Sequence, residues 1–176
     1  MILGQLSLLL SANNILPSVQ SGYRAHHSTE TALCKIYNDL IINSCEGKQT
    51  LLVLLDLSSA FDTVDHSILL TDLYRCGLRD SALELLQSYL TDRSQVVSVG
   101  NALSSPKHLD CGVPQGSVLG PVLFSIYISP IVNILERHGI NYHFYADDMQ
   151  LYFKFASDDI YTQVYLHKES TWFAYK

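Results

Sequence analysis

Apolar residues recur along the chain at two spacings, one typical of helices and one typical of strands. In residues 28–45 they recur every three or four positions, which predicts a helix with Ser28 or Thr29 as its N-cap. Residues 50–57 form a short unbroken apolar run, which is typical of a strand buried on both faces, and Asp56 stands at its end. The apolar face predicted for the helix carries Ala32, Leu33, Ile36, Tyr37, Leu40 and Ile41.

The same patterns predict the remaining elements. The first residues predict a helix leading into the domain, and Ser129–Pro130 predicts a kink or a restart in the helix that begins near residue 116. The order of elements favours an α+β fold, with an antiparallel sheet covered by helices on one face. Further helices are predicted in residues 63–77 and 79–90, and strands in 94–100, 140–146 and 149–155, with 104–112 as a hairpin partner or a loop.

Composition narrows the class of protein. The chain has 176 residues, 48% hydrophobic and 16% charged, which is enough for one globular domain with a core. Its formal net charge of -6 argues against a free-standing nucleic-acid binder, for which a basic surface is expected. The 4 cysteines have no zinc-site spacing and are expected to be reduced thiols of an intracellular protein that is not secreted.

One charge-free segment, residues 111–135, is apolar enough to suggest a membrane span. Pro121, Pro130 and Asn133 interrupt it, so a buried helix in the core is the better prediction. No contact with a membrane is expected.

Three carboxylates stand out. Asp147 and Asp148 are adjacent between two predicted strands, where a tight turn usually carries Gly or Asn. Two carboxylates ~4 Å apart repel by roughly 4 kcal/mol at an effective dielectric near 20. With Asp56, the pair could bind Mg²⁺ or Mn²⁺, and two such ions would form a phosphoryl-transfer centre. The alternative is a solvated acidic turn with Asp56 in a capping role, and spacing alone leaves both open.

Four blocks in order resemble the reverse transcriptases of LINE-type (non-LTR) retrotransposons. Residues 51–66, 112–128 and 144–148 look like motifs A, B and C of that family, and residues 16–33 resemble its fingers segment. The resemblance implies the palm of a right-hand polymerase with part of the fingers and no thumb. It divides the chain into an N-terminal extension, 1–15, a fingers and palm region, 16–155, and a truncated C-terminal tail, 156–176.

The resemblance also implies a role for each matching residue. Asp56, Asp147 and Asp148 would be the catalytic carboxylates that bind two Mg²⁺ or Mn²⁺ ions, with the Leu57 carbonyl as a further ligand. Asp62 and Asp65 are expected to be helix-start acids, and His66 a structural residue. The nucleotide would be bound by Arg24 at the triphosphate, Phe61 as the gate against a 2′-OH, and Gln115 and Gly116 in the turn of the second motif.

The resemblance implies RNA-directed DNA polymerisation in the nucleus or the cytoplasm, with an RNA template, a DNA primer and deoxynucleotides as partners. The chain departs from the family pattern at both ends: neither the basic block before the fingers arginine nor the later lysine and thumb is recognisable. Weak binding of nucleic acid is therefore expected for so acidic a chain. The alternatives are a catalytically inactive relic of a transposable element and a metal-dependent nuclease, although a nuclease would not explain Phe61 or Gln115.

Overall fold

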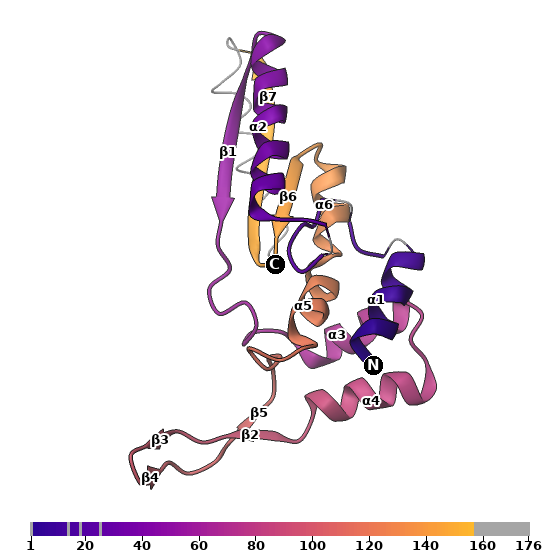
Figure 1. Cartoon of the computed structure of the whole chain (residues 1–176), viewed down its shortest axis with the longest axis vertical. Coiled ribbons are helices and arrows are strands. Elements are labelled where there is room, and N and C mark those ends of the chain that lie inside the picture. Colours follow the sequence, from indigo (N-terminus) through magenta and orange to yellow (C-terminus); the bar gives the residue numbers. More distant parts are fainter. Residues whose placement is uncertain (1, 14, 18, 25, 157–176) are drawn as a thin grey trace.

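The computed structural model of the chain describes residues 2–156 except 14, 18 and 25. Figure 1 shows two connected parts, one built on a three-stranded sheet and one built mainly on helices. The elements are α1 (Ile2–Ala12), α2 (Thr29–Cys45), β1 (Lys48–Leu55), α3 (His66–Arg75), α4 (Asp80–Leu90), β2 (Arg93–Gln95), β3 (Ser98–Val99), β4 (Ala102–Leu103), β5 (Lys107–Leu109), α5 (Gly120–Ile128), α6 (Ile131–Arg137), β6 (Asn141–Tyr145) and β7 (Asp148–Ala156).

The main sheet has the strand order β1-β7-β6, and both pairings are antiparallel. β7 is the central strand, and its register against β1 runs from Lys48 opposite Ala156 to Leu55 opposite Met149. The hairpin between β6 and β7 was predicted from the two apolar runs that flank Asp147. The predicted α+β layout with an antiparallel sheet is therefore confirmed.

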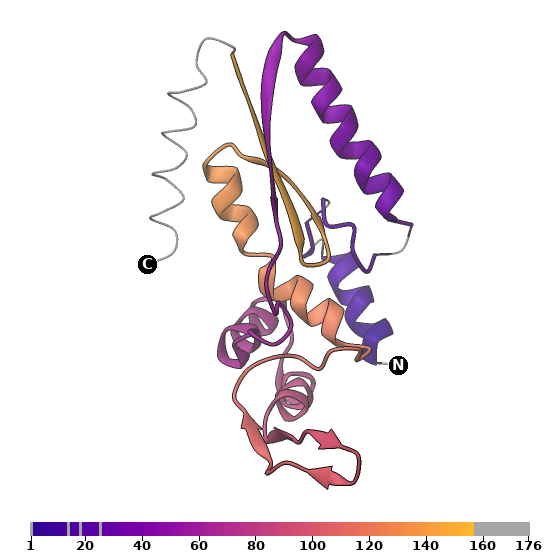
Figure 2. The same cartoon turned by 90° about the vertical axis from the view of Figure 1, so that its left-hand side faces the viewer.

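Helices cover both faces of this sheet, so the prediction that they lie on one face is wrong (Figure 2). On one face the Tyr152 hydroxyl donates a hydrogen bond to the Asp39 carboxylate of α2. Met149 points to the other face, where it shares a hydrophobic cluster with Leu135 of α6. Side chains alternate between the faces of a strand, so β7 can bind a helix on each side.

β1 is an edge strand, and the prediction that it is buried on both faces is also wrong. Leu54 is 69% exposed, and Asp56, which follows the strand, is exposed as well. An apolar run of this length reveals neither whether a strand lies at the edge of a sheet nor how much of each face other elements cover.

α2 begins where the sequence predicted. The Ser28 hydroxyl accepts a hydrogen bond from the Thr31 amide, and the Thr31 hydroxyl accepts one from the Ser28 amide, which completes a capping box. Only part of its predicted apolar face is buried: Ala32 and Ile36 are, whereas Leu33 and Tyr37 are exposed.

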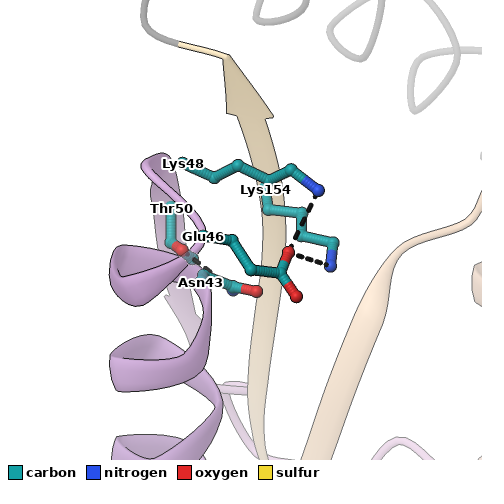
Figure 3. Close-up of polar contacts among 5 residues, drawn as sticks. All are labelled: Asn43, Glu46, Lys48, Thr50 and Lys154. Atoms are coloured by element: carbon teal, nitrogen blue, oxygen red, sulfur yellow. Dashed lines mark hydrogen bonds and ion pairs between the residues drawn. The ribbon is translucent and has the colours of Figure 1, made fainter.

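Polar contacts hold the C-terminal end of α2 against the end of the sheet that lies farthest from the acidic hairpin (Figure 3). The Glu46 carboxylate lies 3.0 Å from the Lys48 ammonium and 3.1 Å from that of Lys154. Hydrogen bonds from these lysines lower the pKa of the Glu46 carboxyl. Asn43 also donates a 3.0 Å hydrogen bond to the Thr50 hydroxyl, so α2 is tied to both paired strands.

The second part of the fold has its own hydrophobic core. It is formed by α1, α3, α4 and α5, and its fully buried members include Leu69, Leu73, Leu90 and Leu123. α1, predicted from the first residues, contributes Leu6 and Leu10. All four cysteines are free thiols.

Residues 111–135 form two short helices rather than one long one. α5 ends at Ile128 and α6 starts at Ile131, so the chain restarts a helix at the predicted Ser129–Pro130 step. α5 is deeply buried, as predicted. Among the residues that the structure describes, no helix is long and apolar enough to cross a membrane.

The segment between α4 and this buried helix forms an extended arm (Figure 1). β2 pairs with β5, and the short strands β3 and β4 pair at the tip. The sequence left residues 104–112 as either a hairpin partner or a loop, and the pairing of β5 selects the hairpin.

Removing side-chain volume from the helical core should destabilise the fold. Leu123 is 0% exposed, and we expect Leu123→Ala to lower the free energy of unfolding by about 2–5 kcal/mol, because it leaves a cavity. Leu103→Ala is the matched control, since Leu103 is 70% exposed at the tip of the arm. Urea denaturation of both variants measures the difference; equal losses would contradict the assigned core.

Candidate active site

The register of the sheet brings the three predicted carboxylates to one end of it. Leu55 of β1 pairs with Met149 of β7, and Tyr145 of β6 pairs with Asp148. Asp56, the residue after β1, therefore lies next to the start of β7 and the β6–β7 turn that precedes it. Residues separated by about ninety positions in the chain become neighbours through backbone pairing alone.

These acids are accessible to solvent and ions. Asp56 and Asp148 are exposed, and Asp147 is half-buried. Within the described part of the chain, no Lys, Arg or His forms an ion pair with any of them. Carboxylate oxygens are suitable donors for Mg²⁺ or Mn²⁺. However, no three His, Cys, Asp or Glu side chains of the described residues converge closely enough to hold a metal ion. The donor set thus fits a divalent cation, and the side chains would have to close around it.

The turn between β6 and β7 is tight. Ala146 and Asp147 are its two central residues, and Ala146 has a φ of 59°. That left-handed conformation normally favours Gly or Asn, so a side chain here is strained. Something outside the hairpin must hold this turn in place.

Residues 19–22 supply that support. The Ser21 amide donates a 2.8 Å hydrogen bond to the Phe144 carbonyl, and the Phe144 amide donates one of 3.0 Å to the Val19 carbonyl. The buried Gln20 side chain reaches Ala146 in the turn itself. Sequence reasoning treated this segment only as the approach to Arg24 and missed Gln20, because nothing in the adjacent sequence points to a partner as distant as Ala146.

Backbone hydrogen bonds join the loop that carries Phe61 to the loop that carries Gln115 and Gly116, whereas Arg24 lies on a different segment. The Val113 amide donates a 2.7 Å hydrogen bond to the Phe61 carbonyl, and the Gly112 amide donates one of 2.8 Å to the Val64 carbonyl. These bonds bring Gln115 close to residues 61–64. The Gln115 amide nitrogen lies 3.5 Å from a carboxylate oxygen of Asp62.

The side chains around this loop differ in exposure. Phe61 is half-buried, and its ring centroid is 5.1 Å from that of Phe124. Gln115 and Gly116 are exposed, and Gly116 has a φ of +73° with open space where a Cβ would lie. Leu57 is half-buried, and its carbonyl accepts a 3.1 Å hydrogen bond from the Ala60 amide.

Of the two acids predicted to lie at the start of a helix, Asp65 does and Asp62 does not. Asp65 is the N-cap of α3 and accepts hydrogen bonds from the Ser67 and Ile68 amides, as predicted. Asp62 does not cap this helix and faces Gln115 instead. His66 has a structural contact, with its ring nitrogen 2.8 Å from the Gly112 carbonyl oxygen.

Arg24 is exposed on the segment that supports the turn. Its guanidinium donates a 3.0 Å hydrogen bond to the Pro17 carbonyl, which uses one of its five N–H groups. Next to it, the pKa of the Tyr23 phenol is raised, first by partial burial and then by the charge of Asp147. The segment that carries Arg24 therefore lies within electrostatic reach of the acidic turn.

The architecture places the chain in a known class of fold. A solved structure of telomerase from Candida albicans, in complex with a fragment of telomeric RNA, matches with a TM-score of 0.65 at 17% identity. The match covers 93% of this chain and 31% of the telomerase chain. At this identity the likeness concerns the fold alone.

Sequence comparison identifies the family. The profile described as "Reverse transcriptase (RNA-dependent DNA polymerase)" matches residues 2–175, so the chain belongs to that family. Two similar proteins from Drosophila melanogaster are the RNA-directed DNA polymerase from mobile element jockey, 33% identical over 84% of this chain, and the probable polymerase from transposon BS, 30% identical over 86%. The chain spans 17% of the length of each. The resemblance to non-LTR retrotransposon enzymes is confirmed.

The contact between the two loops predicts a strong requirement for Gly112. Gly112 has a φ of +92°, and a Cβ there would lie 3.0 Å from the Asp62 carbonyl oxygen. We expect Gly112→Ala to lower the free energy of unfolding by about 3 kcal/mol, through backbone strain and the close contact, against about 1 kcal/mol for Gly100→Ala. Gly100 is the matched control because its φ is +60° with nothing within 4 Å. Chemical denaturation yielding equal losses would refute the close packing of the loops.

Stability should also depend on the protonation of His143. Its Nε2 lies 3.0 Å from the Ser21 hydroxyl, and its pKa is lowered below 6.5, chiefly by burial, then by Lys35 and His27, with Asp39 opposing. The unfolded state thus binds the proton more readily, so this contribution is full above about pH 6.5 and is lost as the pH falls below it. Denaturation from pH 7.5 to 5.5 should show a shallower decline for His143→Gln; identical slopes would contradict the prediction.

Proposed function

We propose that the chain is the catalytic core of an RNA-directed DNA polymerase, which adds deoxynucleotides to the 3′-hydroxyl of a primer paired with an RNA template. The observation that carries this proposal is the register of β1 against β7, which sets Asp56 beside Asp147 and Asp148. Family membership supports the reaction type.

In this proposal Asp56, Asp147 and Asp148, with the Leu57 carbonyl, hold two Mg²⁺ or Mn²⁺ ions. Such ions, when bound, activate the primer hydroxyl and stabilise the charge on the α-phosphate and the leaving pyrophosphate. The exposure of Asp56 and Asp148 lets substrate approach, and the half-burial of Asp147 limits its freedom to move.

The other residues position the nucleotide. The ring of Phe61 is fixed by Phe124, so it presents a rigid surface that excludes a 2′-hydroxyl. Gln115 and Gly116 contact the incoming nucleotide and the template from their exposed turn. Arg24 binds the triphosphate, for which a planar guanidinium with several free N–H groups is suited.

The division of the chain follows the same reasoning. Residues 16–155 form the fingers and palm, and residues 1–15 take the place of part of the fingers. Residues 157–176, the greater part of the predicted tail, lie outside the described residues. The formal net charge of -6 leads us to expect weak, salt-sensitive binding of the template–primer duplex.

Primer extension tests this function directly. The purified chain is given an RNA template, a DNA primer and deoxynucleotides with Mg²⁺ or Mn²⁺. We expect extension by the parent chain and a loss of roughly 100-fold or more for Asp147→Asn, because the substitution removes a charge needed in the transition state. Asp92→Asn is the matched control: Asp92 is exposed in a turn with a φ of 55°, which Asn tolerates.

The outcomes separate the candidate functions. Extension by the parent and by Asp92→Asn, with loss in Asp147→Asn, supports the polymerase. A folded parent chain without any extension would refute it and favour the non-catalytic alternative. Cleavage of the primer in place of extension would favour the nuclease.

A further inference from the structure

The acidic turn is held by a segment that is distant from it in sequence. Gln20 forms a parallel bridge with Phe144, so residues 19–21 extend the main sheet beyond β6. Ser21 adds a side-chain contact, since its hydroxyl lies 3.0 Å from His143 Nε2. The backbone hydrogen bonds of this segment reach Phe144, two residues before Ala146 in the turn.

The Gln20 side chain continues this contact into the turn. Its Nε2 donates a hydrogen bond of 3.3 Å to the Ala146 carbonyl, and its Oε1 accepts one of 3.3 Å from the Ala146 amide. Both backbone polar groups of one residue are therefore bound by a single side-chain amide. Gln20 Oε1 also accepts a 3.1 Å hydrogen bond from the Gly22 amide, which fixes the orientation of the side chain.

Gly22 closes the contact from the other side. A Cβ on this residue would lie 2.1 Å from the Ala146 amide nitrogen, so only glycine lets the two backbones approach so closely. Gln20 and Gly22 together enclose Ala146, the residue with the strained φ of 59°. Gln20 and Gly22 are both buried, and Gln20 is only 2% exposed.

We propose that Gln20 is a positioning residue for the carboxylate of Asp147: by binding both backbone groups of Ala146, it holds the strained turn in the one conformation that presents Asp147 to Asp56. Gln20 touches neither substrate nor metal and acts through the backbone of the turn. The inference rests on the proposed function for its consequence, whereas the contact itself can be measured without any activity.

The geometry also links two parts of the site. Residues 19–22 bind the acidic turn, and Arg24 follows two positions later on the same segment. A shift in the turn would therefore also move the start of the segment that carries the proposed triphosphate ligand. Residues 19–22 and the acidic hairpin are therefore coupled by hydrogen bonds of 2.8–3.3 Å rather than by surface contact alone.

Amide hydrogen exchange tests the contact first. In the full chain we test Gln20→Met, which keeps the length of the side chain and removes its hydrogen bonds to Ala146 and Gly22. We expect exchange at the Ala146 amide to become roughly tenfold faster, the change that corresponds to one lost hydrogen bond. Exchange at the Leu123 amide in the core should stay the same. Gln87→Met is the matched control, since Gln87 is an exposed glutamine of α4. An unchanged Ala146 amide in folded Gln20→Met would overturn the proposal.

The wild-type chain provides the fallback if Gln20→Met does not fold. Its Ala146 amide should then be protected from exchange like the amides of β7, and well above the exposed Gly100. Exchange at the unprotected rate of a loop would overturn the proposal.

Metal binding and kinetics test the positioning role. For folded Gln20→Met we expect the affinity for Mn²⁺ and the kcat of primer extension to fall roughly tenfold, as for other residues that orient a ligand from outside the metal shell. The KM for the deoxynucleotide should change less than kcat. If Gln20→Met speeds exchange at Ala146 but leaves the Mn²⁺ affinity and kcat unchanged, Gln20 has only a structural role and the proposal is overturned. Should no variant extend a primer, Mn²⁺ affinity still decides this inference while the proposed function fails.

Discussion

The antiparallel pairing of β1 with β7 is the constraint on which the candidate active site depends. All eight residues of β1 pair with β7, so a slip of one residue would move every side chain of the strand to the opposite face. The register is fixed at its far end by the ion pairs of Glu46 with Lys48 and Lys154, and along its length by α2 and α6 on the two faces. At its near end it delivers Asp56 to the acidic hairpin. Contacts remote from the carboxylates thereby determine where they lie.

Two loop contacts complete the site around that register. The backbone bonds between residues 61–64 and 112–113 position the proposed nucleotide gate, and Gln20 holds the strained turn before Asp147. Each contact requires a glycine at the point of closest approach, Gly112 in one case and Gly22 in the other. These glycines have a steric reason to be where they are, because a Cβ at either would meet backbone atoms of the opposite loop.

Local signals in the sequence were sufficient for much of the fold. The N-cap of α2 was predicted at Ser28 or Thr29, and Asp65 was predicted as a helix-start acid. A kink or a restart was predicted at Ser129–Pro130, and the helix restarts there. Each of these signals depends on a few adjacent residues. The partial exposure of β1 was not predicted, because five aliphatic residues in a row do not reveal which parts of the two sheet faces other elements cover. That helices cover both faces of the sheet was also not predicted. This arrangement depends on the direction that α6 takes after Pro130, which the local sequence does not specify.

The candidate site shows the same division. The motifs that resemble reverse transcriptases pointed to Asp56, Asp147 and Asp148, and the register makes these residues neighbours. The role of Gln20 could not be read from its own surroundings, since its partner lies 126 positions away. Asp62 was misjudged similarly, because its partner Gln115 comes from a distant loop.

The proposed function requires that the end of the sheet beside Asp56, Asp147 and Asp148 binds divalent cations. Titration of the isotopically labelled chain with Mn²⁺, followed by paramagnetic broadening of its amide signals, tests this most directly. We expect broadening to begin at residues 55–57 and 146–149, while the amides around Glu46, at the opposite end of the same strands, stay sharp. Broadening that spares the acidic hairpin, or that appears first at another acidic surface such as Asp80–Glu84, would contradict it.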